Sequence, residues 1–275
     1  MYHSHIFTTY YTHIILHTIS FYTNIIILYR LYNISVIHNG SEALHGSKEC
    51  IQTLLNKNKK LAILSNTSSP SHVAKKKLPK FGLNEDMFQG GLVSSGEECA
   101  KFIRNSPQLK KALWFTWNES EKQNPMQFLN HCEADRDEID IADSIEDADF
   151  ILLHGSEVLR KCRELSSPTS EDKGIVDLNF LFNEDYTIID ELLDQAIQKS
   201  LPMVCANPDL IVGLPGGKVG NMPGKIAERY AQKGGKTIYQ FGKPNPRHFH
   251  ACLDNLGIPF DSKTTAKSIP CTCRR

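Results

Sequence analysis

Residues 61–70 read LAILSNTSSP. The four apolar residues that open this stretch, Leu61 to Leu64, form a short continuous run, which suits a strand buried on both faces of a parallel sheet. The polar residues that follow, Ser65-Asn66-Thr67-Ser68-Ser69-Pro70, predict a turn at the carboxyl end of that strand. The stretch therefore predicts one strand of an α/β protein.

Helices and strands alternate on both sides of this stretch. The predicted strands cover residues 61–64, 91–94, 150–153, 202–205 and 237–241, and the predicted helices cover residues 47–56 and 187–199. Ser47 is expected to cap the first helix, and Ser95 with Glu98 forms a capping box after strand 91–94. Residues 105–149 are more polar and receive no detailed assignment. The alternation predicts an α/β fold with a mostly parallel sheet and right-handed crossovers.

The strongest local pattern lies near the end of the chain, at Gly242-Lys243-Pro244-Asn245-Pro246. Asn245 is a good N-cap, and Pro246 suits the first helical position because its missing N–H is not needed there. Gly257 is the expected end of this helix. Lys243 therefore lies in a loop at the carboxyl end of strand 237–241, where open α/β sheets place their ligand chemistry.

The composition excludes several classes of function. The 275 residues carry 31 basic and 31 acidic side chains, so no global attraction to nucleic acid or to an anionic membrane is expected. The eight cysteines are scattered without a CxxC pair, which is typical of reduced thiols in the cytoplasm and counts against a four-thiolate zinc site. No P-loop, dinucleotide-binding fingerprint or serine-hydrolase elbow is present.

The two ends differ from the middle. Residues 1–35 contain no acidic residue, and Ile14–Tyr29, the candidate membrane segment, is interrupted by polar residues and falls short of the roughly 20 apolar residues a span needs. A membrane partner is therefore not expected. The tail, residues 262–275, is equally atypical.

The early histidines are interpreted as a chance cluster rather than as metal ligands: His3, His5, His13 and His17.

Three segments, in this order, resemble subclass IIA of the haloacid dehalogenase (HAD) superfamily. They are residues 36–40 (VIHNG), residues 64–66 with residues 94–97 (SSGE) after the next strand, and residues 242–246 (GKPNP). The resemblance implies a Rossmann-like core, a parallel sheet with helices on both faces, apparently incomplete at both ends. The core would comprise residues 36–104 and 237–261, and an inserted α/β cap residues 105–236.

The resemblance also implies a chemistry. Members of the family hydrolyse phosphomonoesters through an aspartyl-phosphate intermediate with Mg²⁺, so the expected partner is a small phosphorylated metabolite. Ser65 matches the residue that hydrogen-bonds the transferring phosphoryl group, and Lys243 matches the lysine that neutralises its charge. The expected substrate-binding residues are Asn66, Asn207 and Asp209. Oligomeric state and substrate identity stay open.

Each match has a plainer interpretation. Ser65 could cap the following helix, and Lys243 could be a solvated loop lysine. Asn207 and Asp209 could serve only to build a turn, because Asn-Pro-Asp is good turn chemistry.

The sequence departs from the family at its first and fourth motifs. Tyr32 occupies the position of the nucleophilic aspartate and Ile34 that of the second aspartate; no acidic residue precedes Glu42. After Gly257 the expected strand and Gly-Asp are missing, and Asp261 is the one acid there. The usual Mg²⁺ ligands are thus absent, and no metal ligand is predicted.

Both departures coincide with the atypical ends. We therefore expect a coding frame that is wrong or decayed before about residue 36 and after about residue 267, and little or no phosphatase activity. A phosphate-ester-binding pseudoenzyme is the alternative, and a membrane-tethered protein without enzymatic activity is the third.

Overall fold

The computed structural model describes the main chain of residues 25–29, together with residues 37–38, 42–120, 124–164, 174–214 and 217–258. Tyr32, Ile34 and Asp261, most of segment 1–35 and the tail 262–275 lie outside the described residues. The chain divides into two compact units. The smaller unit comprises residues 1–64, 75–93 and 249–275, and the larger one residues 65–74 and 94–248.

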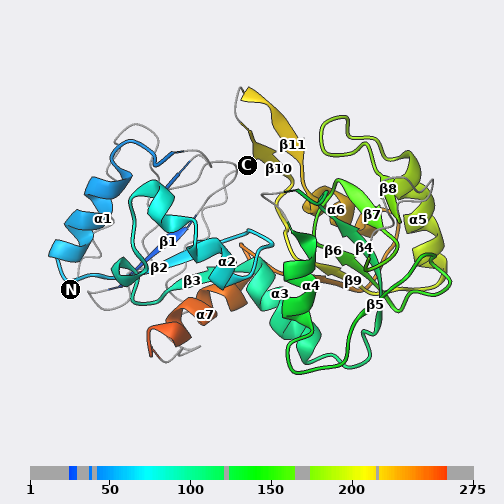
Figure 1. Cartoon of the computed structure of the whole chain (residues 1–275), viewed down its shortest axis with the longest axis horizontal. Coiled ribbons are helices and arrows are strands. Elements are labelled where there is room, and N and C mark those ends of the chain that lie inside the picture. Colours follow the sequence, from blue (N-terminus) through cyan, green and yellow to red (C-terminus); the bar gives the residue numbers. More distant parts are fainter. Residues whose placement is uncertain are drawn as a thin grey trace, which may run out of the picture. The chain divides into compact units, whose positions relative to one another are not determined.

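The smaller unit is built on a three-stranded sheet in the order β1 (Ile25–Tyr29), β2 (Lys60–Ser65) and β3 (Leu92–Ser94) (Figure 1). Strand β2 is buried from Leu61 to Leu64, which confirms the prediction from its apolar run. Strand β1 pairs parallel with β2, from Ile25 opposite Lys60 to Tyr29 opposite Leu64. This strand falls in the segment that was weighed as a membrane span, and the sequence analysis did not predict it.

Two helices of the smaller unit agree with prediction in extent. Helix α1 covers Ser47–Asn56, but its N-cap is Gly46, with φ 77°, and not Ser47. The predicted cap is wrong because the residue before the helix, Gly46, adopts the left-handed conformation and Ser47 is already the first helical residue. The buried hydroxyl of Ser47 has no hydrogen-bond partner in the described structure. Helix α7 (Pro246–Asn255) is capped by Asn245 as predicted, whose Oδ1 accepts a hydrogen bond from the amide of Arg247 at 3.1 Å.

Helix α7 closes the core of this unit. Cys252 is fully buried against Ala62, Leu64 and Val93, which come from β2 and β3. The apolar residues that repeat along α7 lie around this cluster: Phe249, Ala251, Leu253 and Leu256. Short helical turns lie between β2 and β3: η1 (Leu78–Phe81) and η2 (Glu85–Met87) in this unit, and α2 (Ser71–Lys75), most of which belongs to the larger unit.

The larger unit contains a seven-stranded sheet with the order β12-β9-β6-β4-β7-β8, in which β5 also pairs with β4. The pairs β12–β9, β9–β6, β6–β4 and β4–β5 are parallel, whereas β7 and β8 are antiparallel additions, so the predicted mostly parallel sheet is confirmed. The strands are β4 (Lys111–Thr116), β5 (Asp140–Ile141), β6 (Phe150–Leu153), β7 (Val158–Arg160), β8 (Ile175–Asp177), β9 (Met203–Cys205) and β12 (Ile238–Gln240). A separate hairpin joins β10 (Ile211–Gly213) to β11 (Val219–Asn221).

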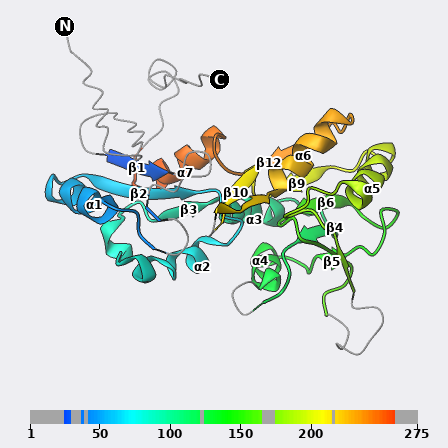
Figure 2. The same cartoon turned by 90° about the horizontal axis from the view of Figure 1, so that it is seen from above.

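Helices cover both faces of the larger sheet. Side chains alternate along the central strand, so that Trp114 packs with α3 (Ser95–Arg104) and α4 (Pro125–Cys132). Phe115 packs on the opposite face with α5 (Thr187–Gln198) and α6 (Pro223–Gln232). In Figure 2, α6 lies above the sheet and α4 below it. The apolar runs of the parallel strands are buried because both faces are covered.

The predicted capping box of Ser95 and Glu98 is wrong, because the N-cap of α3 lies one residue earlier. Ser94 is the N-cap, and its Oγ accepts a hydrogen bond from the amide of Glu97 at 3.1 Å. Ser95 instead donates to the carbonyl of Thr67, and Glu98 pairs with Lys101 on the helix surface.

None of the described helices combines the length and apolar character that a membrane span requires. The predicted core and cap boundaries at residues 105 and 236 stay predictions.

Candidate functional site

Asn66, the residue after β2, joins two loops that are distant in sequence. Its side chain is buried, with 5% exposed, and its Nδ2 donates to Oδ1 of Asp209 at 2.8 Å and to the carbonyl of Lys243 at 3.2 Å. Its Oδ1 accepts from the amide N–H of Lys243 at 2.7 Å. The structure therefore brings together Asn66, Asp209 and Lys243, three of the residues singled out from the sequence. The side-chain amide of Asn66 is hydrogen-bonded to both of the others.

The Asn207-Pro208-Asp209 loop is a turn, as the plainer interpretation expected. Oδ1 of the buried Asn207 accepts from the amide of Asp209 at 3.0 Å, and its carbonyl accepts from the thiol of Cys205 at 3.2 Å. A Cβ atom at Gly224 would lie 2.2 Å from the Pro208 carbonyl oxygen, so the start of α6 packs directly on this turn. The turn directs the carboxylate of Asp209 toward Asn66.

A glycine allows the Lys243 loop to approach Asn66. Gly242 has φ 129°, and a Cβ there would lie 2.6 Å from the Pro208 ring and 2.8 Å from Oδ1 of Asn66. The Lys243–Pro244 peptide bond is cis. Glycine at position 242 therefore allows the close approach of the predicted Gly-Lys-Pro segment to Asn66 and Pro208.

Lys243 is partly buried, and its positive charge acts on the imidazole of His248. Burial, and after it the charge of Lys243, lowers the pKa of His248 to about 4. His248 is fully buried, and its Nδ1 accepts a hydrogen bond from the Gly242 amide at 3.3 Å. The neutral imidazole therefore carries its hydrogen on Nε2, which has no partner in the described structure.

Ser65 ends β2 and is partly buried. Its Oγ accepts a hydrogen bond from the amide of Thr67 at 3.3 Å. Helix α2 begins later, at Ser71, so Ser65 stabilises the turn directly after its strand and does not cap that helix. The catalytic role of Ser65 stays a prediction.

The two segments that resembled the family's second motif lie against each other. The amide of Gly96 donates to the carbonyl of Thr67 at 3.0 Å, and Ser94 Oγ donates to the carbonyl of Ser69 at 2.8 Å. A Cβ at Gly96 would lie 2.0 Å from the Ser68 carbonyl oxygen, so this position accepts glycine only. The close approach fixes the turn after β2 on the start of α3.

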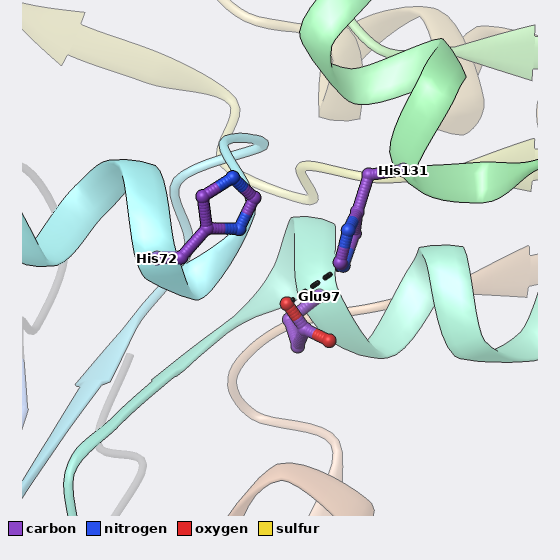
Figure 3. A group of neighbouring side chains, drawn as sticks. All are labelled: His72, Glu97 and His131. Atoms are coloured by element: carbon purple, nitrogen blue, oxygen red, sulfur yellow. Dashed lines mark hydrogen bonds and ion pairs between the residues drawn. The ribbon is translucent and has the colours of Figure 1, made fainter. Parts of the chain in front are cut away.

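A group of three side chains in the larger unit was missed by the sequence analysis. Glu97 was noted only within the SSGE segment, and His72 and His131 were not considered. They come from α2, α3 and α4, and their ligand atoms all lie within 4.8 Å of one another (Figure 3). No spacing in the sequence marks this group, because the tertiary fold alone brings these short segments together.

The described residues do not fit the Mg²⁺ that the resemblance implies. Asp209 is the carboxylate at the Asn66–Lys243 junction, and one carboxylate is too few because Mg²⁺ and similar hard cations are bound by several oxygen ligands. Within the described part of the chain, the convergent group of three or more possible metal ligands is the one around Glu97, and two of its members are imidazoles. The positions of Tyr32 and Ile34 lie outside the described residues.

Comparisons with known proteins identify the fold. Residues 35–124 match the family model of a haloacid dehalogenase-like hydrolase. The chain has the haloacid dehalogenase-like fold. The resemblance stated from the sequence is thus confirmed, although the degenerate first and fourth motifs are not tested by it. No curated protein matches the sequence significantly.

Several solved structures share this HAD-like fold at low sequence identity. A haloacid dehalogenase-like hydrolase from Brucella suis has a TM-score of 0.61 at 20% identity, with 86% of this chain and 73% of that chain covered. A possible sugar phosphatase from Cytophaga hutchinsonii has a TM-score of 0.56 at 16% identity, covering 86% and 73%. A 4-nitrophenylphosphatase from Thermotoga maritima has a TM-score of 0.52 at 19% identity, covering 86% and 74%.

Proposed function

We propose that this HAD-like protein binds small phosphorylated metabolites beside Ser65 and Lys243, with little or no Mg²⁺-dependent hydrolysis. The observation that carries the proposal is the double hydrogen bond from Asn66 to the main chain of Lys243. It fixes the backbone of a cationic residue against the loop after β2. Two structures of the same fold are described as phosphatases, which supports a phosphate ester as the ligand.

The residues at this junction supply phosphate-binding chemistry without a catalytic step. The ammonium group of Lys243 neutralises phosphate charge, and lysine is a common phosphate ligand. Ser65 accepts a hydrogen bond from the Thr67 amide, and a hydroxyl in that position can at the same time donate its own hydrogen to a phosphate oxygen. Asn66 and Asn207 position the two loops.

Hydrolysis of the family's kind needs a carboxylate nucleophile. Tyr32 stands at that position, and no acidic residue precedes Glu42. A bound Mg²⁺ would supply electrostatic stabilisation of the phosphoryl group, but the described residues do not provide its ligand set. Binding without efficient turnover is therefore the function that these residues support.

The proposal is tested with the full chain and the variants Lys243→Ala and Lys236→Ala. Lys236 is an exposed lysine of the same unit and serves as the matched control. Binding of inorganic phosphate and of 4-nitrophenyl phosphate is measured by calorimetry, and release of 4-nitrophenol is followed with Mg²⁺ present. We expect no measurable turnover and at least about a tenfold loss of affinity in Lys243→Ala, because hydrogen bonds to charged groups contribute about 1.5–3 kcal/mol and about 1.4 kcal/mol is a factor of ten.

Two results would count against the proposal in different ways. Robust turnover that Lys243→Ala abolishes would show an active phosphatase. Equal phosphate affinities of wild type and Lys243→Ala would show that Lys243 does not contribute to phosphate binding.

We further propose a cytoplasmic location. The described cysteines are all free thiols, which is typical of a reducing compartment: Cys50, Cys99, Cys132, Cys162, Cys205 and Cys252. Thiol titration of protein isolated under alkylating conditions tests this, and recovery of disulfides among these cysteines would contradict it.

A further inference from the structure

Three side chains from three helices converge at one place in the larger unit. In Figure 3 the ring of His72 on α2 and the ring of His131 on α4 approach the carboxylate of Glu97, which stands on the first turn of α3. The ring centroids of the two histidines are 5.3 Å apart, with planes inclined by 55°. His72 is exposed and the other two are partly buried, so the group is accessible from solvent.

The separations of the ligand atoms approach those of a metal site. A zinc ion binds imidazole nitrogen and carboxylate oxygen at about 2.0–2.2 Å, so neighbouring ligands of a tetrahedral ion are about 3.3 Å apart. Nε2 of His131 lies 2.9 Å from Oε2 of Glu97, and all the ligand atoms of the group lie within 4.8 Å of one another. Small side-chain rotations would therefore be sufficient to enclose an ion.

The surrounding contacts hold two of the ligands in place. The amide of Ser71 donates to Oε2 of Glu97 at 3.3 Å, and Nη1 of Arg104 donates to the carbonyl of His131 at 2.6 Å. Nε2 of His131 and Oε2 of Glu97 are hydrogen-bonded to each other at 2.9 Å, and an ion bound by both atoms would replace the hydrogen between them. The Ser71 contact restricts the orientation of the Glu97 carboxylate, whereas the Arg104 contact fixes only the main chain of His131. Contacts to the side chain of a metal ligand increase affinity because they restrict its orientation.

Two neighbouring cations act against metal binding. Nη2 of Arg104 lies 3.7 Å from Oε1 of Glu97, and Lys101 on the same helix contributes a further positive potential at the carboxylate. Arg104 faces Oε1, whereas His131 faces Oε2, so the oxygen nearest the imidazole is not the one that the guanidinium approaches. These charges reduce affinity without occupying the metal position.

We propose that His72, Glu97 and His131 bind a divalent transition-metal ion, with zinc as the best match. Two imidazoles and one carboxylate suit zinc, whereas magnesium and calcium prefer oxygen ligands. Three protein ligands leave a fourth tetrahedral position for water or a small anion, as in open zinc sites. The three ligands include neither Lys243 nor Asp209, and the proposal does not depend on the proposed phosphate binding.

The test compares the full chain with His72→Ala and with the control His45→Ala. Both residues are exposed histidines, so neither substitution removes a core side chain. Each protein is stripped with a chelator and titrated with ZnCl₂ by calorimetry and with Co²⁺ by visible absorption. His3, His5, His13 and His17 form a background that is common to all three proteins, so the difference between variants is the quantity of interest.

We expect His72→Ala to lose one equivalent of zinc or to bind it at least about tenfold more weakly, since even outer contacts of a metal site are worth 10–100-fold. His45→Ala should match wild type, and the Co²⁺ spectrum should lack a thiolate charge-transfer band. Glu97→Gln, which keeps the size of the side chain, should weaken binding as well. Identical titrations of wild type and His72→Ala, or Co²⁺ binding entirely through thiolate, would overturn the proposal.

Discussion

The side chain of Asn66 satisfies both polar groups of the Lys243 main chain, with its Oδ1 on the amide at 2.7 Å and its Nδ2 on the carbonyl at 3.2 Å. The two residues are 177 positions apart in sequence. A primary amide is suited to this task because it carries a donor and an acceptor side by side, as a peptide group does. The contact therefore fixes the first residue after β2 to the Gly-Lys-Pro loop.

Replacing Asn66 with alanine should lower the free energy of unfolding by about 1–3 kcal/mol, because partly buried polar groups of Lys243 and Asp209 would each lose a hydrogen bond. The matched control is Asn105→Ala, since the amide of Asn105 makes an exposed hydrogen bond to the carbonyl of Lys101. That variant should stay within about 0.5 kcal/mol of wild type. Urea denaturation measures both, and equal losses in the two variants would contradict the special role of Asn66.

Gly224→Ala should disturb the Asn207–Asp209 turn, because its Cβ would lie 2.2 Å from a carbonyl oxygen that cannot move aside. We expect a loss of about 2–3 kcal/mol in unfolding free energy and weaker binding of inorganic phosphate. Gly234→Ala is the comparison: nothing lies within 4 Å of its added Cβ, although its φ of 105° disfavours alanine. The phosphate affinity of Gly234→Ala should equal that of wild type. Equal phosphate affinities of Gly224→Ala and Gly234→Ala would show that the Asn207–Asp209 turn does not influence phosphate binding.

His154 should make the folded protein sensitive to acid. It is fully enclosed between Phe128, whose ring stacks on it at 4.2 Å, and Thr116, whose Oγ1 lies 2.9 Å from Nδ1. Burial lowers the pKa of His154 from 6.5 to about 3. Between these pH values the unfolded chain binds a proton that the folded protein does not, so stability falls as pH falls from about 6.5 toward 3, with a slope of at most about 1.4 kcal/mol per pH unit.

The variant His154→Gln should flatten this slope while lowering stability at neutral pH, because glutamine does not titrate and fills the ring's place poorly. The control His45→Gln changes an exposed histidine and should keep the slope of wild type. Unfolding free energies from urea titrations at several pH values between 4 and 8 provide the comparison. Parallel curves for His154→Gln and wild type would show that other groups cause the acid sensitivity.

The departures at the ends of the sequence lead to a prediction about the gene. Sequencing the coding region and translating its three frames should reveal an Asp-x-Asp-Gly or Asp-x-Trp-Gly run that joins Val36, and a Gly-Asp beyond codon 262. Such a run would show a working phosphatase in the present or recent past of the organism. Its absence from every frame would instead favour the phosphate-binding pseudoenzyme.

The sequence was sufficient to predict the strands that are buried on both faces. The runs at residues 61–64 and 150–153 are short, apolar and bounded by polar residues, so their type was determined locally. The helix Thr187–Gln198 and the N-cap Asn245 were equally clear, because helical periodicity and capping chemistry act within a few residues. Local signals thus gave the fold class.

Other elements could not be predicted, since their cause is not local. The central strand Lys111–Thr116 lies in a polar region, and its burial depends on α3 and α4 packing over it. The strand Ile25–Tyr29 was missed although its run of three isoleucines favours a strand, because the segment was judged by its unusual composition. The group of His72, Glu97 and His131 exists only through tertiary packing.

All seven strands of the larger sheet lie between Lys111 and Gln240, in one uninterrupted stretch of chain. The three-stranded sheet, in contrast, requires residues from Ile25 to Ser94, with α7 packed on it from the far end. During synthesis the larger sheet can therefore be completed before the last residues are translated. Among the described residues, those before Lys111 and after Gln240 contribute no strand to the larger sheet, so a substitution there removes none of its strands.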